Sequence, residues 1–315
     1  MSEEPGIGAS SPQVPVEDQR CGFIAVVGAP NAGKSTLVNA LVGAKVTIVS
    51  RKAQTTRVPI RGITIEGASQ LIFIDTPGIF APRRRLDRAM VEAAWARATD
   101  ADVIALVVDA AKGAEDEDTA RILAKLGDVR AQRLLLLNKV DRVKKESLLG
   151  VAAALNAKLP FAATFMISAL KGSGIEDLRK HLAALVQPGP WHYPEDDISD
   201  APLRLLAAEI TRERLYERLH DELPYSATVE TTSWKDLRDG SVRIEQTIFV
   251  ERESQRRIVL GEGGRSIKQI SMESRRQFGE IIDKPVHLFL FVKVRDSWQN
   301  DPERYREIGL DFPKT

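Results

Sequence analysis

The first half of the chain alternates short apolar runs with longer amphipathic stretches. Apolar runs of about four to eight residues are typical of buried strands, and apolar positions three and four residues apart are typical of helices. The alternation predicts a doubly wound α/β domain over residues 20–186, with a mostly parallel six-stranded sheet and one antiparallel edge supplied by a hairpin. The predicted strands are 23–27, 59–66, 70–75, 103–109, 133–137 and 161–167, and the predicted helices are 36–41, 86–99, 115–126, 145–159 and 175–185.

A different order of elements follows in the second half of the chain. The pattern predicts an amphipathic helix, two strands around the turn Asp239-Gly240, two helices separated by G-E-G-G, and a final strand. This is the order of a type II KH module, an α+β fold that we place at residues 201–295. The expected elements span 202–219, 227–234, 241–252, 255–260, 265–282 and 287–294.

Three segments lack this periodicity. Residues 1–19 combine acidic residues with Pro, Gly and Ser, which is typical of a disordered tail. Residues 187–200 contain Pro, Gly and acidic residues and are expected to form a linker between the two domains. Residues 296–315 are expected to form a C-terminal tail.

Composition narrows the class of protein. The 315 residues carry a net charge of +1, so any nucleic-acid-binding surface has to be local. The single cysteine, Cys21, excludes an internal disulfide and a cysteine-based metal site, as expected in a reducing cytoplasm. No apolar run reaches the length of a membrane span, and the N-terminus lacks the basic start and apolar centre of a signal peptide. We therefore expect a cytoplasmic globular protein.

The segment between the first strand and the first helix fits the phosphate-binding P-loop pattern G-x-x-x-x-G-K-[ST]. Its glycines allow loop N–H groups and the positive end of the helix dipole to approach phosphate oxygens. Lys34 is expected to reach the β- and γ-phosphates, and the Ser35 hydroxyl to ligate Mg²⁺. The alternative is a glycine-rich turn that matches by chance, which the flanking strand and helix disfavour. The residues assigned to the loop are Gly28, Ala29, Pro30, Asn31, Ala32, Gly33, Lys34, Ser35 and Thr36.

A second motif, D-T-P-G, ends the strand at 70–75. A carboxylate at the carboxyl end of a strand beside a P-loop suits a partner of Mg²⁺, either bound directly or through one of its ligands, and the glycine could donate its backbone N–H to the γ-phosphate. The three arginines at 83–85 that follow form either a solvated face or a partner surface. The residues assigned here are Asp75, Thr76, Pro77, Gly78 and Ile79.

Two later motifs predict which base is bound. A carboxylate at Asp141, in N-K-V-D, can accept from guanine N1–H and the exocyclic amine together, whereas adenine offers neither donor in that geometry. The preceding polar pair is expected to brace the base and the P-loop, with an exposed polar turn as the alternative. Backbone N–H groups after the strand at 161–167 could reach the guanine carbonyl. The assigned residues are Asn138, Lys139, Val140 and Asp141, with Ser168, Ala169 and Leu170.

The G-E-G-G turn between two helices is a candidate RNA clamp. A GxxG turn lets a nucleic-acid backbone approach closely and holds about four nucleotides. Basic residues on both sides could neutralise phosphates, whereas Glu262 counts against this function because a carboxylate repels phosphate. The alternative is a simple glycine turn between helices. The residues assigned to the clamp are Gly261, Glu262, Gly263 and Gly264, flanked by Arg256, Arg257, Arg265 and Lys268.

With these motifs in place, the chain resembles the Era GTPases over roughly residues 20–312. The resemblance implies a bacterial ribosome-assembly GTPase whose KH domain holds the 3′ end of 16S ribosomal RNA of the 30S subunit. It also implies a mainly cytoplasmic protein that is sometimes peripheral at the inner membrane, and we expect a monomer. Beyond the motifs above, it rests on S-R-K-A-Q-T-T-R at 50–57, Y-P-E-D at 193–196 and E-L-P-Y-S at 222–226.

The resemblance also implies roles for single residues. The threonine that meets Mg²⁺ is expected to be Thr56, with Thr55 as the alternative. Asn31 is similar to a P-loop asparagine that ligates K⁺ in potassium-stimulated relatives, although its amide could equally brace the loop. Ras-like enzymes place a water-orienting glutamine after D-x-x-G, where this chain has Ile79, so we expect slow intrinsic GTP hydrolysis. The expected catalytic residues are Lys34, Ser35, Thr56 and Gly78.

Three other functions fit parts of this pattern. A GTPase whose C-terminal domain docks a protein partner is favoured by Glu262 and opposed by the arginines around it. A tRNA-modifying GTPase would share T-T-R but carries a C-terminal cysteine, which this chain lacks. An ATP-dependent kinase is opposed by N-K-V-D.

Overall fold

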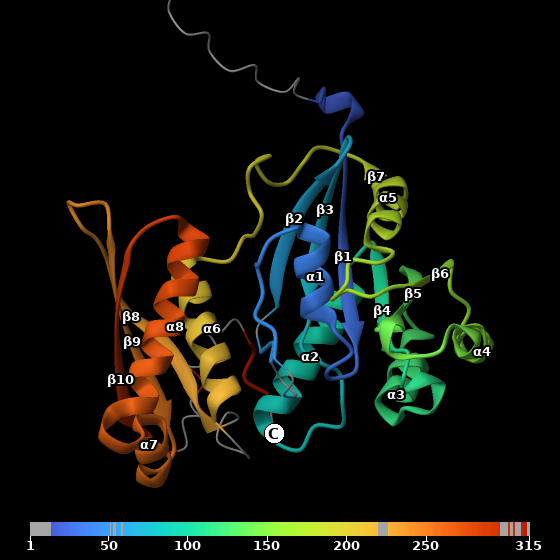
Figure 1. The fold of residues 1–315 in the computed structure, drawn as a ribbon. Coiled ribbons are helices and arrows are strands. Elements are labelled where there is room, and N and C mark those ends of the chain that lie inside the picture. The colour runs from blue at the N-terminus through green and yellow to red at the C-terminus, as the bar shows by residue number, and fades with distance from the viewer. Residues whose placement is uncertain are drawn as a thin grey trace, which may run out of the picture.

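The computed structural model describes residues 14–50, 52, 55–57, 59–219, 226–296, 302, 305 and 310–313. These residues form two domains that lie side by side (Figure 1). The described part of the first domain is a seven-stranded sheet with helices on both faces, and that of the second is a three-stranded sheet. The order of an α/β domain followed by an α+β domain is the order that the sequence predicts.

The first sheet reverses its strand order beside β1. The spatial order is β2-β3-β1-β4-β5-β6, and all neighbours are parallel except β2 and β3, which form the antiparallel hairpin. The chain therefore leaves β1 toward one edge and then returns to the other side, which creates a crevice at the carboxyl ends of the strands. The strands are β1 (Arg20–Gly28), β2 (Ile60–Glu66), β3 (Ser69–Asp75), β4 (Val103–Asp109), β5 (Gln132–Asn138) and β6 (Ala163–Met166).

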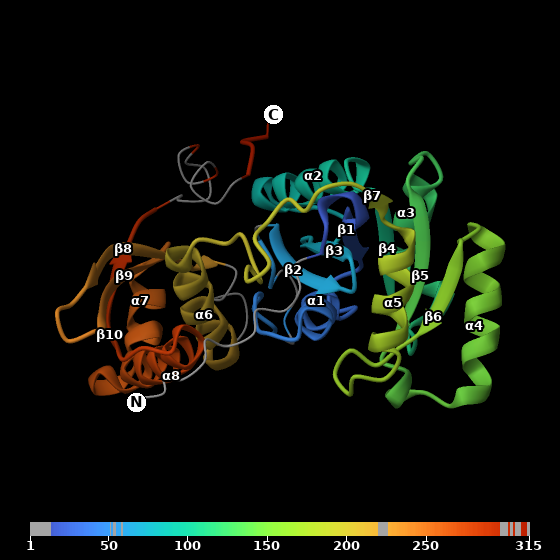
Figure 2. The same cartoon turned by 90° about the horizontal axis from the view of Figure 1, so that it is seen from above.

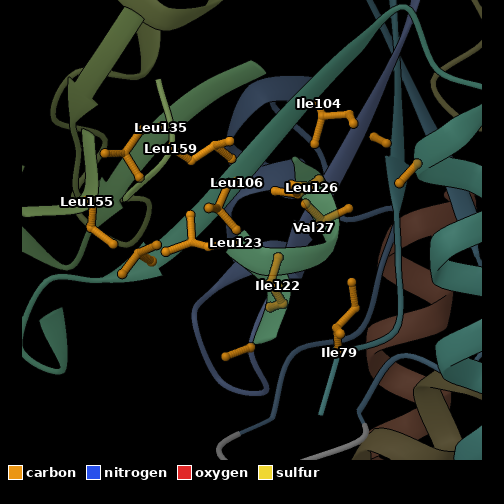
Figure 3. Packing of buried hydrophobic residues seen from close by; sticks show 14 of the residues in the cluster. Val27, Ile79, Ile104, Leu106, Ile122, Leu123, Leu126, Leu135, Leu155 and Leu159 are labelled. Carbon is orange, nitrogen blue, oxygen red and sulfur yellow. The ribbon is translucent and has the colours of Figure 1, made fainter. Parts of the chain in front are cut away.

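Helices cover both faces of this sheet, as Figure 2 shows. Along β1, Ala25 and Val27 pack into one apolar cluster while Ile24 and Val26 pack into the other, because side chains alternate across a strand. Leucines and isoleucines from strands and helices fill the first cluster (Figure 3). Helices α1 (Lys34–Val42) and α5 (Ile175–Leu185) cover one face, and α2 (Arg85–Thr99), α3 (Glu117–Leu126) and α4 (Lys145–Lys158) cover the other.

The second domain packs its helices on one face of its sheet. Strand β9 is central, with β8 antiparallel and β10 parallel to it. A 3₁₀ turn, Glu262–Gly264, separates two of the helices. The elements are α6 (Leu203–Arg218), β8 (Thr228–Asp236), β9 (Val242–Val250), α7 (Glu253–Leu260), α8 (Arg265–Ile282) and β10 (Val286–Val294).

The segment expected to be a linker is attached along most of its length to the first domain. Its first two residues, Gln187–Pro188, form the unpredicted strand β7, which pairs with the start of β1. Further on, the Gln70 side chain accepts from the amides of His192 and Tyr193, and the Ile63 amide donates to the Ile198 carbonyl at 2.9 Å. The segment joins the two domains, and its backbone groups also pair with β1 and with the edge strand β2.

Both expected tails also contain ordered contacts. Residues Val16–Asp18 form a 3₁₀ turn, and the Gln19 side chain accepts from the Trp191 amide at 3.0 Å; residues 1–13 lie outside the described residues. At the other end, Tyr305 and Leu310 are buried against α2, so the segment expected to be a tail contacts the first domain at these residues.

Among the described residues, no helix combines the length and the apolar character needed to cross a membrane.

Candidate functional site

The four sequence motifs of the first domain meet at one edge of its sheet. The P-loop follows β1, D-T-P-G follows β3, N-K-V-D follows β5, and the loop at 168–170 follows β6. A pocket in this edge is lined by P-loop residues, by Thr55 and Thr56, and by Gly78. The carboxyl ends of parallel strands beside a reversal of strand order are where such sheets bind ligands.

The P-loop is packed so closely that its two glycines cannot be replaced without displacing neighbours. A Cβ on Gly28 would lie 2.4 Å from the carbonyl oxygen of Val107. A Cβ on Gly33, whose φ is +100°, would lie 2.3 Å from Nδ2 of Asn138. Glycine is therefore required at both positions by close contacts with the neighbouring strands.

Lys34 begins α1 and lies inside the loop. Its side chain is buried, and Nζ donates to the carbonyl oxygens of Gly28 at 3.1 Å and Ala29 at 3.0 Å. Burial lowers the pKa of Lys34 to about 8, and the nearby carboxylate of Asp75 opposes this shift. The lysine is therefore held in the position from which it can donate to phosphate oxygens.

Three oxygen-bearing side chains converge next to this lysine. Oδ2 of Asp75 accepts from the Ser35 hydroxyl at 2.8 Å and the Thr56 hydroxyl at 3.0 Å, and the two hydroxyl oxygens lie 2.9 Å apart. Burial raises the pKa of Asp75 to about 6, although the hydrogen bond from Ser35 and the charge of Lys34 lower it. Oδ1 of Asp75 is buried and has no hydrogen-bond partner among the described residues.

This donor set fits Mg²⁺. Hard divalent cations prefer carboxylate and hydroxyl oxygens, and Mg²⁺ typically uses few protein ligands together with substrate phosphates. Of the two candidate threonines, the structure brings Thr56 to Ser35 and Asp75. The hydroxyl of Thr55 instead donates to the carbonyl oxygen of Lys52 at 2.8 Å.

The D-T-P-G segment is tied to the P-loop. The Ile79 amide donates to the Gly28 carbonyl at 3.1 Å, and a Cβ on Gly78 would lie only 3.0 Å from Cα of Pro30. The side chain of Ile79 packs in the apolar cluster that also contains Val27 (Figure 3). Because this side chain is apolar and buried, it cannot orient an attacking water.

At the carboxyl end of β5, N-K-V-D braces two loops. Asn138 donates through Nδ2 to the Ala32 carbonyl at 2.9 Å and accepts through Oδ1 from the Ala169 amide at 3.0 Å. Lys139 donates to the carbonyl of Asn31 at 2.6 Å and pairs with Asp109 at 2.7 Å. The alternative of an unconstrained polar turn does not describe these contacts.

Asp141 is exposed, so a base can reach its carboxylate from solvent. Its carboxylate accepts from the Ser168 hydroxyl at 2.6 Å, and this hydrogen bond lowers its pKa. The Val140 amide donates to the Ile167 carbonyl at 3.2 Å, and Leu170 is exposed. The pair of carboxylate and hydroxyl therefore holds the acceptor group in one orientation.

Asn31 has the left-handed backbone conformation, with φ at +62°. It lines the pocket, and its backbone carbonyl accepts the hydrogen bond from Lys139. The loop is thus braced at this position through the main chain of Asn31.

The second glycine-rich loop, at 261–264, lies between α7 and α8. Gly261 is confined, since a Cβ there would lie 2.7 Å from Cβ of Ser266. Gly263 and Gly264 have φ values of +59° and +78°, and a Cβ on either would meet nothing within 4 Å. The middle of this loop is therefore open to a ligand backbone.

The charged residues around this loop are not equivalent. Arg257, Arg265 and Lys268 are exposed or partly exposed, and Glu262 is exposed within the loop. Arg256 is partly buried, pairs with Glu253 at 2.9 Å and donates to the Val292 carbonyl at 3.3 Å. Three cations that reach solvent and one carboxylate thus surround the open glycines.

Sequence reasoning missed several residues that hold the site together. Asp109 holds Lys139, and Arg212 donates to the Thr55 carbonyl next to the Mg²⁺-site threonine. Arg57 was predicted only as part of S-R-K-A-Q-T-T-R, and it donates to the Ala227 carbonyl. Asp109 and Arg212 lie in no phosphate or base motif, so no local signal marks them. Their partners are distant in the chain and are brought close by tertiary packing.

Comparisons with known families divide the chain as the structure does. The model of the 50S ribosome-binding GTPase family matches residues 23–139. The model of the KH domain matches residues 222–299.

Relatives of known name and solved structure match the chain almost end to end. GTPase Era of Bradyrhizobium sp. strain BTAi1 is 64% identical over 95% of this chain and 97% of the relative, and that of Brucella suis is 60% identical over 93% and 94%. Two solved structures match with a TM-score of 0.88, 36% identity and coverage of 92% of this chain and 99% of theirs. They are Era with MgGDPNP and nucleotides 1506–1542 of 16S ribosomal RNA, and a variant of Aquifex aeolicus Era bound to GDP·AlF₄⁻. This chain belongs to the Era GTPase family.

Proposed function

We propose that this protein uses GTP binding and hydrolysis to time its contact with the 3′ end of 16S ribosomal RNA during assembly of the 30S subunit. The observation that carries the proposal is that one chain contains two glycine-rich loops, each suited to bind phosphate groups. Beside the P-loop lie the oxygens of Ser35 and Asp75, which suit Mg²⁺, and the carboxylate of Asp141 suits guanine. The GxxG loop is open and flanked by cations. The relative solved with MgGDPNP and 16S RNA nucleotides has the same architecture.

The reaction is GTP + H₂O → GDP + phosphate. Lys34 and the loop amides would neutralise charge on the β- and γ-phosphates, and the Gly78 amide would donate to the γ-phosphate. Mg²⁺, held by Ser35, Thr56 and Asp75 through the oxygens described above, would supply charge neutralisation between the phosphates. Since Ile79 cannot orient water, intrinsic hydrolysis is slow and depends on a partner.

Guanine selectivity would come from Asp141. Its carboxylate is held by Ser168 and can accept two hydrogen bonds from guanine, while adenine leaves it unpaired. An ATP-dependent kinase is disfavoured by this arrangement.

We propose K⁺ as a second cation, with the side-chain oxygen of Asn31 as a ligand. The support is that Asn31 lines the pocket and that, within the described part of the chain, its backbone carbonyl makes the contact that braces the loop. Replacing K⁺ by Na⁺ should slow hydrolysis, and equal rates would remove Asn31 from the mechanism.

A cytoplasmic location, with a fraction peripheral at the inner face of the membrane, completes the proposal. The ribosomal partner and the single free cysteine support the cytoplasm. Fractionation of cells into soluble and membrane pools would test both parts.

The decisive experiment crosslinks the protein to cellular RNA with and without a non-hydrolysable GTP analogue. We expect crosslinks near the 3′ end of 16S RNA that depend on the nucleotide. Recovery of a protein partner without RNA would instead support the alternative of a protein-docking domain, which Glu262 favours. Salt dependence of binding separates the two, because phosphate contacts weaken steeply as salt rises.

A further inference from the structure

The segment that carries Thr56 belongs to the first domain, but residues of the second domain also hold it. Helix α6 is the second-domain helix nearest to the first domain (Figure 2). Its Glu213 accepts from the Val49 amide at 2.7 Å and pairs with Lys45 at 2.6 Å. The start of the segment is therefore fixed to α6.

Further contacts lie directly beside Thr56. On one side, Nη2 of Arg212 donates to the Thr55 carbonyl at 2.5 Å. On the other side, the Arg57 guanidinium donates to the Tyr216 hydroxyl at 3.1 Å and to the Ala227 carbonyl at 2.9 Å. Both neighbours of the threonine are thus held by side-chain or backbone groups of the second domain.

Arg212 and Tyr216 are suited to this task by their spacing and burial. Residues four apart lie on one face of a helix, and both side chains are almost completely buried between the domains. Arg212 is also held by Glu209, whose carboxylate accepts from its Nε at 2.8 Å. The Arg212 and Arg57 guanidinium carbons lie 5.2 and 5.9 Å from the centre of the Tyr216 ring.

We infer that Arg212 and Tyr216 are positioning residues of the GTPase reaction, because they hold the backbone on both sides of Thr56 and so keep its hydroxyl against Ser35 and Asp75. Neither side chain lines the nucleotide pocket itself. The GTPase centre is completed only when α6 of the second domain is seated against Lys45, Val49 and residues 55–57. The inference rests on the proposed GTP and Mg²⁺ site.

The test uses the full chain with Arg212→Gln and Tyr216→Phe. The second variant removes one hydroxyl and keeps the ring, so it stays informative if the first does not fold. The matched control is Arg218→Gln, because Arg218 lies on the same helix but contacts Gln269 and Glu273 of its own domain. All variants are first compared with the unmodified chain by thermal unfolding.

The readout is affinity for a non-hydrolysable GTP analogue and for GDP across a series of Mg²⁺ concentrations. In GTPases, the segment that carries the Mg²⁺-site threonine, here Thr56, is ordered by the γ-phosphate and Mg²⁺ and is released when the γ-phosphate is absent. Loss of one charged hydrogen bond should therefore weaken binding of the GTP analogue by about tenfold in Arg212→Gln and by about threefold in Tyr216→Phe. GDP affinity should stay unchanged, and Arg212→Lys should restore part of the loss.

Amide hydrogen exchange at residues 55–57 in the analogue complex gives a second readout. Exchange should be faster in Arg212→Gln and unchanged in the control. Equal analogue affinities and equal exchange in all variants would overturn the inference. Failure of the unmodified chain to bind GTP would instead overturn the proposed function, so the two failures are distinguishable.

Discussion

The P-loop and the G-E-G-G loop are both rich in glycine, yet their surroundings differ. In the P-loop, added Cβ atoms at Gly28 and Gly33 would meet atoms of other strands at 2.4 and 2.3 Å. In the middle of the second loop, Gly263 and Gly264 have open space around them. The charged groups differ in the same way, since Lys34 is buried and Arg257 and Arg265 are exposed.

These different surroundings determine which ligand each loop can bind. A preformed and buried loop binds one small anion in one geometry, because its donors are already held by their neighbours. An open loop with flexible cations can follow a polymer backbone and bind it with strong dependence on salt. Four experiments test this contrast, beginning with the largest expected effect.

Replacement of Gly33 by Ala should abolish tight GTP binding. Alanine is strained at the positive φ of this position, and its methyl group would displace Asn138. We therefore expect an affinity loss of about a hundredfold or more. Titration with a fluorescent GTP analogue measures it. The control is Gly43→Ala, where φ is +81° but nothing lies within 4 Å. Unchanged affinity in Gly33→Ala would show that the P-loop is less constrained than its contacts indicate.

Replacement of Gly263 by Asp should reduce RNA affinity by at least about tenfold, because a carboxylate is placed where phosphate approaches. The open surroundings should let the variant fold, with the melting temperature close to that of the unmodified chain. Filter binding with an RNA ending in the 16S 3′ sequence measures the loss. Gly240→Asp, in an exposed hairpin of the same domain, is the control. Full RNA binding by Gly263→Asp would contradict the clamp.

The two loops should also respond differently to pH. Burial lowers the pKa of Lys34 to about 8, below its ordinary value of 10.5. Phosphate binds the charged form, so above pH 8 binding has to take up a proton and becomes weaker. We expect GTP affinity to fall by about tenfold between about pH 7 and pH 9. RNA binding that rests on arginine should change little over this range, since guanidinium groups keep their charge. A GTP affinity independent of pH would contradict the burial of Lys34.

The smallest expected effect is that of Glu262. Glu262→Gln removes the one carboxylate among the loop residues, and RNA affinity should rise about twofold at low salt. The gain should shrink at high salt, because exposed charges are screened. A fall in RNA affinity would indicate that the carboxylate contacts RNA bases or a protein partner instead.

Much of the fold was determined by the sequence itself. Hydrophobic periodicity is a local property of the chain. Helices such as α5 (Ile175–Leu185) and α8 (Arg265–Ile282) were therefore predicted with the observed bounds. The phosphate and base motifs also place their residues correctly at the strand ends, because each motif follows directly on a buried strand. The choice of Thr56 over Thr55 agrees with the hydrogen bonds of the structure.

Other features depend on contacts between segments far apart in the chain, and only the tertiary structure decided them. The segment expected to be a linker pairs with the start of β1, and the C-terminal residues Tyr305 and Leu310 pack against α2. Arg212 lies 157 positions from Thr55, whose carbonyl it holds. No periodicity or motif records such contacts, because they arise from the packing of distant segments against one another. The sequence therefore determined the chemistry of the GTP site, and the tertiary structure decided which side chains hold that chemistry in place.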